Sequence, residues 1–427
     1  MNEYEKLLHD NYKIDKNVMD FVEAAEKEID EQLQTFDAVR AYNNYKVLSA
    51  FKRTEVANRH FAGTTGYGYS DIGRDKLGEL FAEIFGAEAA IVTPNISSGT
   101  NAIAIALFGL LRPLDKMLSI TGRPYDTLIN VIGCDEGNKT TNASLVDYAI
   151  RYEEVGLDVV GCIDIGRIMD ILHLIQDIKI VYIQRSRGYA KRPAITINEI
   201  EHVCHIIKAR FPDVMIVVDN CYGEFTETRE PTEVGADLMI GSLIKNPGAG
   251  IAPTGAYFAG TQKAIDLLAE RLTCPGIGAE IGSYAYGYLP YYQGIYLAPS
   301  VVCNAMKGAV LAAYVFSKTG KEVYPLFDAK RSDITQMICF DTENELIEFV
   351  RNVQKASPVD SNVVPYPWDM PGYSDQVIMA AGTFIQGNSI EMSADAPIKS
   401  PYCAYFQGGL TIEQIKLAIM LSLQNIL

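Results

Sequence analysis

Short apolar runs alternate with stretches of helical period through the middle of the chain. Each run is rich in the β-branched and aromatic residues that favour strands. The runs cover Ala89–Thr93, Lys116–Ile120, Ile178–Gln184, Met215–Asp219, Leu238–Gly241 and Gly255–Ala259. Strands separated by helices predict a mainly parallel, doubly wound α/β sheet with ligands bound at the carboxyl ends of its strands. The last two runs lie close enough in sequence to be antiparallel neighbours.

Helical periodicity dominates on both sides of this region. Residues 3–52 are charged, with apolar positions on one helical face, and Arg74–Phe85 is typical of an amphipathic helix. A long helix-forming stretch runs from about Ala298 to Lys318. We expect three parts, which are a helical arm over residues 1–60, a large domain over 61–297, and a smaller α+β domain with its linking helix over 298–427.

The composition is that of a globular enzyme, because 48% of the 427 residues are hydrophobic and 21% are charged. The net charge of −16 argues against nucleic-acid or membrane-surface binding, since both need basic patches. The eight cysteines form no C-x-x-C pair and no histidine stands at metal-ligand spacing, so we expect most of the cysteines to pack as core residues in a reducing compartment, and no metal site. A charged N-terminus and no stretch of membrane-spanning length predict a cytoplasmic protein.

Two of the apolar runs lead to an ionisable residue. Met215–Asp219 ends in an acid, and the next run continues through Gly-Ser-Leu-Ile to Lys245. A pyridoxal 5′-phosphate (PLP) site requires both groups, a carboxylate that keeps the pyridinium nitrogen protonated and a lysine that forms the Schiff base. Taken singly, each residue has the ordinary interpretation of a solvated strand end. The pair, with glycines around Lys245, indicates a PLP site.

The loop after the first strand places hydroxyls and free amides at the start of an apolar helix. Ser98, Gly99 and Thr100 stand at this N-terminus, where unpaired N–H groups stabilise an anion. Ser242 adds a further hydroxyl. An ordinary helix cap is the alternative interpretation, and the presence of Lys245 favours a phosphate site.

Three further residues are candidates for contact with cofactor or substrate. Tyr125 follows the second strand and is expected to stack on the pyridine ring, with a phenol able to give a proton to a leaving group. Arg185 and Arg187 follow the strand before Asp219, and a guanidinium fork suits the α-carboxylate of an amino acid. A solvated basic turn is the equally supported alternative for both arginines.

Tyrosines interleaved with glycines follow the last of these strands. They either line the substrate pocket, make a subunit contact or pack in the ordinary way. The set comprises Tyr284, Tyr286, Tyr288, Tyr291, Tyr292 and Tyr296.

The order of these parts resembles the fold-type I PLP enzymes, which share the fold of aspartate aminotransferase, and most closely the cystathionine and methionine γ-lyase group. More narrowly, three segments look like the bacterial aluminium-resistance subgroup, whose members are regarded as carbon–sulfur lyases. These segments are Ile183–Tyr189, Val218–Phe225 and Gly382–Gly387. The resemblance implies a mainly parallel seven-stranded sheet, PLP on Lys245, and a homo-oligomer, as a dimer of dimers. It also implies α,β- or α,γ-elimination from a sulfur-containing amino acid (EC 4.4.1.-), as in cystathionine β-lyase or methionine γ-lyase, with Lys245, Tyr125 and Asp219 catalytic.

The chain departs from the γ-lyase pattern at two places. That group carries Tyr-x-Arg in an arm loop that reaches the phosphate of a neighbouring subunit, whereas this chain has Tyr67-Gly68-Tyr69. Tyr67 is therefore the expected cofactor contact across the interface. The group also binds the substrate carboxylate with a C-terminal arginine, and the matching stretch here carries Lys399. The role falls either to Lys399 or to Arg185 and Arg187.

Fold and cofactor do not fix the reaction. A PLP-dependent aminotransferase or aldolase-type enzyme is the alternative on the same scaffold. A non-catalytic metal-tolerance or assembly protein with a vestigial PLP fold is an alternative of another class, and the intact lysine, aspartate and phosphate loop count against it.

Overall fold

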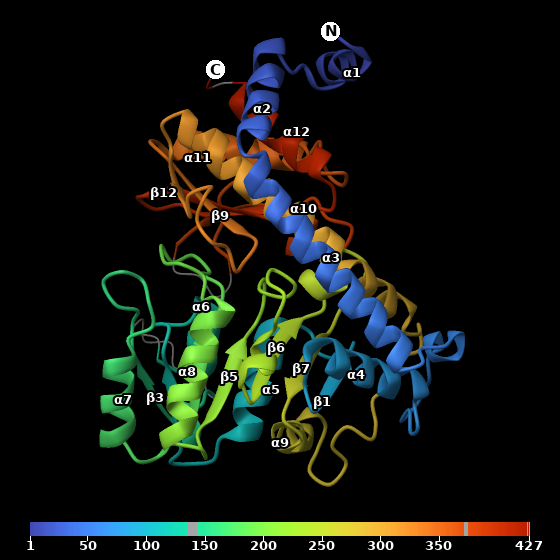
Figure 1. The fold of residues 1–427 in the computed structure, drawn as a ribbon, viewed down its shortest axis with the longest axis vertical. Helices are drawn as coiled ribbons and strands as arrows, with labels where there is room; N and C mark the ends of the chain where they lie inside the picture. The colour runs from blue at the N-terminus through green and yellow to red at the C-terminus, as the bar shows by residue number, and fades with distance from the viewer. Residues whose placement is uncertain (135–142, 371–374, 425, 427) are drawn as a thin grey trace.

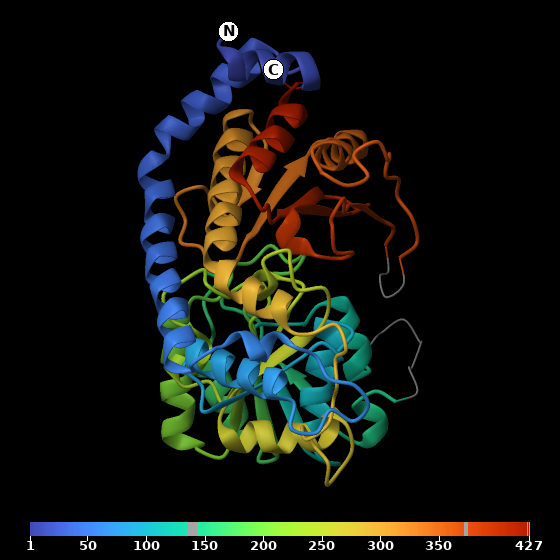
Figure 2. The same cartoon turned by 90° about the vertical axis from the view of Figure 1, so that its right-hand side faces the viewer.

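The computed structural model describes residues 1–134, 143–370, 375–424 and 426, and these form two sheets with helices around them (Figures 1 and 2). The larger sheet has seven strands in the order β1-β7-β6-β5-β4-β2-β3. Its strands are β1 (Ala89–Thr93), β2 (Lys116–Ser119), β3 (Arg151–Glu154), β4 (Ile178–Gln184), β5 (Met215–Asp219), β6 (Leu238–Ser242) and β7 (Ala256–Gly260). Only β7 runs antiparallel to its neighbours. The prediction of a mainly parallel seven-stranded sheet is confirmed, and so is the antiparallel pairing of the last two predicted strands.

Helices account for most of the remaining chain. The α-helices are α1 (Glu3–Tyr12), α2 (Lys16–Glu28), α3 (Asp30–Arg53), α4 (Ile72–Phe85), α5 (Gly99–Leu110), α6 (Asp126–Ile132), α7 (Ile165–Leu174), α8 (Ile197–Arg210), α9 (Gln262–Leu272), α10 (Leu289–Lys318), α11 (Glu343–Lys355) and α12 (Ile412–Leu423). Short 3-10 helices cover Asn58–Phe61, Val146–Tyr148, Pro231–Val234, Asn246–Gly248 and Ser389–Glu391.

Both faces of the large sheet are buried, which explains why its central strands are apolar throughout. Along β5, Ile216 and Val218 pack in the core formed with α4, α7 and α8, whereas Val217 packs in the core formed with α5, α6 and α9. Successive side chains of a strand point to opposite faces, so a strand covered by helices on both sides needs apolar residues at every position.

The edge strand β3 was not predicted. Its four residues, Arg151–Glu154, are charged or polar apart from the tyrosine ring, and none is buried. An edge strand paired on one side only needs no apolar run, so its sequence carries no strand signal. Its parallel register with β2 is set by the backbone alone.

The smaller sheet is antiparallel and lies in the C-terminal part. Its order is β10-β11-β12-β9-β8, with β8 (Glu322–Tyr324), β9 (Thr335–Phe340), β10 (Val377–Ala380), β11 (Ser393–Pro397) and β12 (Tyr402–Gln407). Its core includes side chains of α10, α11 and α12 together with Leu8, Val18 and Val22 from the N-terminal helices. The two ends of the chain therefore share one core. The domain boundaries expected from the sequence stay a prediction.

Two long helices join the parts. Helix α3 runs along one side of the molecule from the small sheet to α4 (Figures 1 and 2), and it packs against α10. Helix α10 starts nine residues before the predicted Ala298, continues through Pro299, and includes the buried Tyr291 and Tyr292. By length and composition α10 could cross a membrane, but 67% of its most apolar window is buried inside the protein, as in a core helix.

The expectation of unpaired cysteines is wrong for one pair. Cys339 and Cys403 stand opposite each other on β9 and β12 and form a disulfide. They are 64 residues apart in sequence, and only the antiparallel pairing of the two strands brings them together. Of the free cysteines, Cys204, Cys221 and Cys303 are buried as expected, whereas Cys162 and Cys274 are exposed.

Candidate functional site

A cavity of about 550 Å³ lies between the two sheets, at the carboxyl ends of the parallel strands. The larger sheet contributes side chains at the ends of β4, β5 and β6, which are Gln184, Asp219, Ser242 and Lys245. The smaller sheet contributes Thr335, Val377, Asp395, Tyr405 and Gln407. Among the residues predicted from the sequence, those that line the cavity are Ser98, Gly99, Thr100, Tyr125, Arg187, Asp219, Ser242, Lys245 and Lys399.

Asp219 ends β5 with its carboxylate almost completely buried. The Tyr182 hydroxyl donates to Oδ2 at 3.4 Å, and the backbone N–H of Cys221 donates to Oδ1 at 3.1 Å. Burial raises the pKa of Asp219, and the positive charge of Lys245 acts in the opposite direction. A carboxylate with so few donors inside the protein has room to bind one more positively charged group.

Lys245 follows β6 and lies beside the ring of Tyr222, with Nζ 4.1 Å from the ring centroid. The aromatic face favours the charged amine. Burial alone would lower the pKa of Lys245, but the neighbouring Cys221 and Tyr222, and after them Asp219, raise it above its ordinary value. Tyr222 has a φ of 70°, a left-handed conformation that costs energy in a residue other than glycine and is characteristic of functional sites.

The N-terminus of α5 forms one wall. Ser98 caps this helix by accepting a hydrogen bond from the backbone of Asn101 at 3.1 Å. At Gly99 a Cβ atom would lie 3.6 Å from both Cys221 Sγ and Ser242 Cβ, so any longer side chain would fill the space between the helix and β6. The free N–H groups of the first helical turn therefore face a gap that a phosphate-sized anion can enter.

Tyr125 is fixed from two sides. Its hydroxyl lies 3.1 Å from Thr100 Oγ1, and its backbone N–H donates to Gln184 Oε1 at 3.0 Å. Burial raises the pKa of Tyr125 far above its ordinary value, and the nearby Asp219 adds to this shift. The phenol is therefore neutral and can act as a proton donor.

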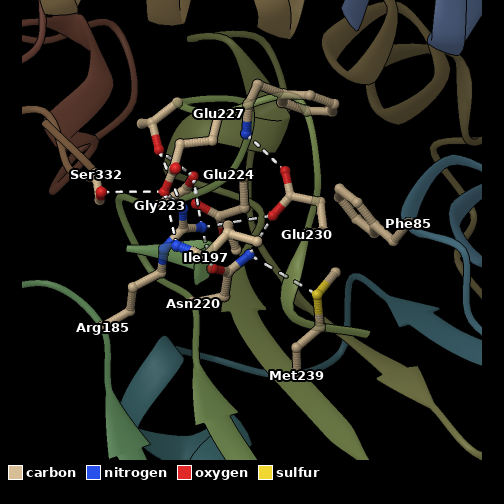
Figure 3. A network of polar contacts seen from close by, with 12 residues as sticks. Phe85, Arg185, Ile197, Asn220, Gly223, Glu224, Glu227, Glu230, Met239 and Ser332 are labelled. Carbon is tan, nitrogen blue, oxygen red and sulfur yellow. Dashed lines mark hydrogen bonds and ion pairs between the residues drawn. The ribbon is translucent and has the colours of Figure 1, made fainter. Parts of the chain in front are cut away.

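Arg185 belongs to a buried network behind the sheet edge (Figure 3). Its Nη1 donates to Asn220 Oδ1 at 2.8 Å and to the carbonyl of Gly223 at 2.9 Å. Its guanidinium forms ion pairs with Glu227 at 3.0 Å and Glu230 at 3.6 Å. The side chain is fully buried and does not line the cavity. The structure does not bring Arg185 to the site, and the interpretation as a solvated turn is wrong for Arg185 as well.

Arg187 and Lys399 do line the cavity, and both have carboxylate partners. Arg187 is buried, pairs through Nε with Asp333 Oδ2 at 3.3 Å, and donates from Nη1 to the carbonyl of Tyr324 at 3.1 Å. It is therefore no solvated turn either. Lys399 forms an ion pair with Asp375 at 2.8 Å, and its side chain is mostly exposed.

The sequence reasoning missed further cavity residues, and two of them are charged side chains that bear on ligand binding, Arg192 and Asp395. Arg192 is partly buried and donates only to backbone carbonyls, those of Pro193, Gln184 and Ser186, and it has no ion pair within the described ranges. It stands in the basic stretch after β4, so that stretch was the available signal. Asp395 is buried on β11, within the segment that replaces the arginine of the γ-lyase group.

Tyr67 and the tyrosine run from Tyr284 to Tyr296 do not line the cavity. Tyr67 is 71% exposed. Within the tyrosine run, Tyr288, Tyr291 and Tyr292 are buried in the core, and Tyr286 is exposed. None of the run lines the cavity, so the pocket-wall interpretation is wrong for these residues. In the described ranges, no group of three or more His, Cys, Asp or Glu side chains is placed to hold a metal ion.

The chain is similar to known proteins both in sequence and in structure. The family model for methionine gamma-lyase matches residues 18–427. Uncharacterized protein YnbB from Bacillus subtilis (strain 168) is 48% identical over 385 residues, which are 90% of each chain. The crystal structure of a carbon-sulfur lyase involved in aluminum resistance from Clostridium novyi NT is 46% identical, covers 100% of both chains and has a TM-score of 0.95. The pyridoxal-5′-phosphate-dependent protein YhfS from Escherichia coli shares the fold, with 16% identity, a TM-score of 0.61, and coverage of 92% of this chain and 97% of that one.

Proposed function

Since the chain belongs to the methionine gamma-lyase family, we propose that it is a PLP-dependent carbon–sulfur lyase acting on a sulfur-containing amino acid. The observation that carries the proposal is the meeting of a buried acid, a half-buried amine and a helix N-terminus at one cavity. An amino-acid substrate is a small molecule, and a cavity of about 550 Å³ is large enough for it together with the cofactor.

The residues present fit PLP. Asp219 would hold the protonated ring nitrogen, because its buried carboxylate lacks an ion pair among the described residues. The N-terminus of α5, with Ser98 and Thr100, would hold the phosphate, and Ser242 lies across the gap beside Gly99. Lys245 would carry the aldehyde carbon, and Tyr125 would cover the ring. When bound, the cofactor supplies an electron sink that stabilises negative charge at the substrate α-carbon.

Protein groups then move the protons. Lys245 would be the base that removes the α-proton of the substrate, because its amine lies inside the cavity. Tyr125 is a neutral phenol beside Thr100 and donates a proton to the departing sulfur. Asp219 would keep the ring nitrogen of a bound cofactor positively charged, which would make the α-proton easier to remove.

The substrate carboxylate needs a cation with no other counter-ion. Arg187 and Lys399, both predicted from the sequence, already pair with Asp333 and Asp375. Arg192 donates only to backbone carbonyls and lines the same cavity. We therefore assign the α-carboxylate to Arg192, since a guanidinium without an ion pair gains most from binding a carboxylate.

Borohydride reduction of the protein incubated with PLP, followed by peptide mapping, tests the cofactor. A pyridoxyl group on Lys245 is expected. Incubation with S-substituted cysteines should then release thiol, ammonia and a keto acid in equal amounts. Transfer of the amino group without thiol release would point to an aminotransferase, and a colourless protein without any adduct would overturn PLP dependence. A homo-oligomeric state and a cytoplasmic location stay predictions.

A further inference from the structure

Asp395 places a buried acid on the wall of the cavity that the smaller sheet provides. It stands on β11, is 9% exposed and lines the same cavity as Lys245. Gln407 Nε2 donates to its Oδ2 at 3.3 Å, whereas Oδ1 has no hydrogen-bond partner in the part of the chain that the structure describes. One oxygen of this carboxylate is thus available to a ligand.

The surroundings hold Asp395 in position without neutralising it. Gln407, its neighbour on β12, is itself oriented by Ser393, to whose Oγ it donates at 3.1 Å. Burial raises the pKa of Asp395 to about 6, and the Tyr189 hydroxyl and the positive charge of Lys245 act in the opposite direction. Two further cations of the cavity are engaged elsewhere, Arg187 with Asp333 and Lys399 with Asp375. Among the described residues Asp395 has no ion pair. A buried carboxylate in this state is costly unless a ligand supplies the missing positive charge.

The position on the small sheet indicates which part of the substrate meets Asp395. The α-carboxylate is repelled by an acid, and its proposed partner Arg192 lies in the loop after β4, hydrogen-bonded to the end of that strand of the large sheet. The α-amine is committed to the cofactor. The end of the substrate side chain beyond the sulfur is the part that remains.

We propose that Asp395 binds a positively charged group at the far end of the substrate side chain, so that the preferred substrates are sulfur amino acids whose leaving thiol carries an amine. This inference rests on the lyase function proposed above and names its substrate class. An S-methyl group alone, as in methionine, has nothing to offer the free carboxylate oxygen.

Two matched substrates test the preference. S-(2-aminoethyl)-L-cysteine and S-propyl-L-cysteine have the same length and differ only in a terminal ammonium or methyl group. The wild-type enzyme should favour the amine in kcat/KM by roughly 10- to 100-fold, the range expected of one charged hydrogen bond. Asp395→Asn should remove most of this preference by lowering kcat/KM for the amine substrate, and it should leave the rate with S-propyl-L-cysteine almost unchanged. Asp375→Asn, the control, removes another cavity acid, which is already paired with Lys399, and should keep the preference.

Binding without turnover gives a second measurement. Ornithine and norleucine form a matched pair with no sulfur to eliminate, and calorimetry on the PLP-loaded wild-type and Asp395→Asn proteins gives their dissociation constants. Ornithine should bind more tightly to the wild type only. Equal use of the two cysteine substrates by the wild type would overturn the inference while the lyase function stood. Equal losses on both substrates in Asp395→Asn would also overturn it, because they would assign a proton-transfer or structural role. Failure of the wild type to release thiol from any substrate would instead count against the lyase function itself.

Discussion

Asp219 is buried, yet among the described residues it forms no ion pair of the kind that buried charges usually require. Such a charge destabilises a folded protein unless a ligand compensates it. A cofactor with a cationic ring nitrogen would compensate it. The instability of the empty arrangement is therefore a physical reason to expect tight cofactor binding.

Lys245→Ala should lose the pyridoxyl adduct and at least about a thousandfold in turnover, because it removes both the cofactor attachment and the general base. Its melting temperature without cofactor should change little, since the change removes a half-buried side chain and no large apolar surface. Peptide mapping after borohydride reduction and a thiol-release assay measure the two effects. Lys399→Ala, at the exposed rim of the same cavity, is the control and should keep the adduct. Labelling of another lysine in Lys245→Ala at the wild-type level would contradict the assignment.

Glu224 gives the fold a pH dependence. Burial raises its pKa from an ordinary 4.5 to about 8, and the charge of Glu230 adds to the shift. Because the folded-state pKa is the higher one, the neutral carboxyl stabilises the fold fully below pH 4.5, and this contribution is lost as the pH rises through about 8. Glu224→Gln should therefore raise the unfolding free energy by on the order of 3 kcal/mol at pH 7, more at pH 8 and little at pH 5.

Denaturant unfolding of the wild type and Glu224→Gln from pH 5 to 8 measures this difference in unfolding free energy. The matched control is Glu201→Gln, which removes an exposed acid paired with Arg229 and should give a small difference that hardly varies with pH. A gap for Glu224→Gln of the same size at every pH would show that this carboxyl is already ionised in the fold.

At the level of elements, Arg185 holds the end of β4 to the loop that follows β5 (Figure 3). Arg185→Met should cost about 3–5 kcal/mol, because it leaves the buried Glu230 without its cation, whereas the partly buried Glu227 keeps its ion pair with Lys330. The exposed pair of Arg229 with Glu201 offers a control, since Arg229→Met should cost about 0–1 kcal/mol. Thermal melts compare the two variants. The folded fraction of Arg185→Met should keep its KM, and a large rise in KM with unchanged stability would restore Arg185 as a substrate ligand.

The sequence predicted the elements that are buried on both sides. The bounds of β1, β4 and β5 agree with the predicted runs, because each is a short apolar segment ended by polar residues. Strand β3 escaped because Arg151–Glu154 is an exposed edge. The sequence did not predict the start of α10, because the tyrosines and glycines before Ala298 are typical of a loop. Tyr291 and Tyr292 are nevertheless buried by contacts with distant segments.

The catalytic residues that the sequence predicted most directly are those that stand at or just after the end of an apolar strand. Asp219 and Lys245 each follow an apolar run, so local sequence marks them. The roles of Arg185 and Arg192 depend on which guanidinium lies beside acidic side chains in the folded chain, and no local sequence pattern predicts this. Asp395 faces the cavity only because the small sheet lies over the large one.

At the scale of the whole molecule, the arm loop that carries Tyr67 and Tyr69 is aromatic and yet exposed in a single chain. Tyr67 and Tyr69 are 71% and 61% exposed, and their rings lie 5.8 Å apart, so they form a small aromatic patch away from the cavity of their own chain. The loop is nevertheless ordered, because Gly282 donates its N–H to the carbonyl of Tyr67, and Arg74 donates to that of Gly68. An ordered, exposed aromatic loop is what a symmetric partner would bury.

We therefore expect the Tyr67 loop to complete the cofactor site of a neighbouring subunit, so that Tyr67→Ala is inactive for lack of phosphate contact rather than for lack of folding. Mixing Tyr67→Ala with Lys245→Ala tests this by subunit exchange. If each site takes Tyr67 from one chain and Lys245 from the other, half of the mixed dimers' sites are wild type, and a random equal mixture should recover about a quarter of full activity. Tyr286→Ala, which removes an exposed tyrosine outside the arm loop, is the control and should be active alone. Tagged subunits first show that exchange takes place. If activity still does not recover, each chain builds its site alone, and the exposed loop would then need another partner.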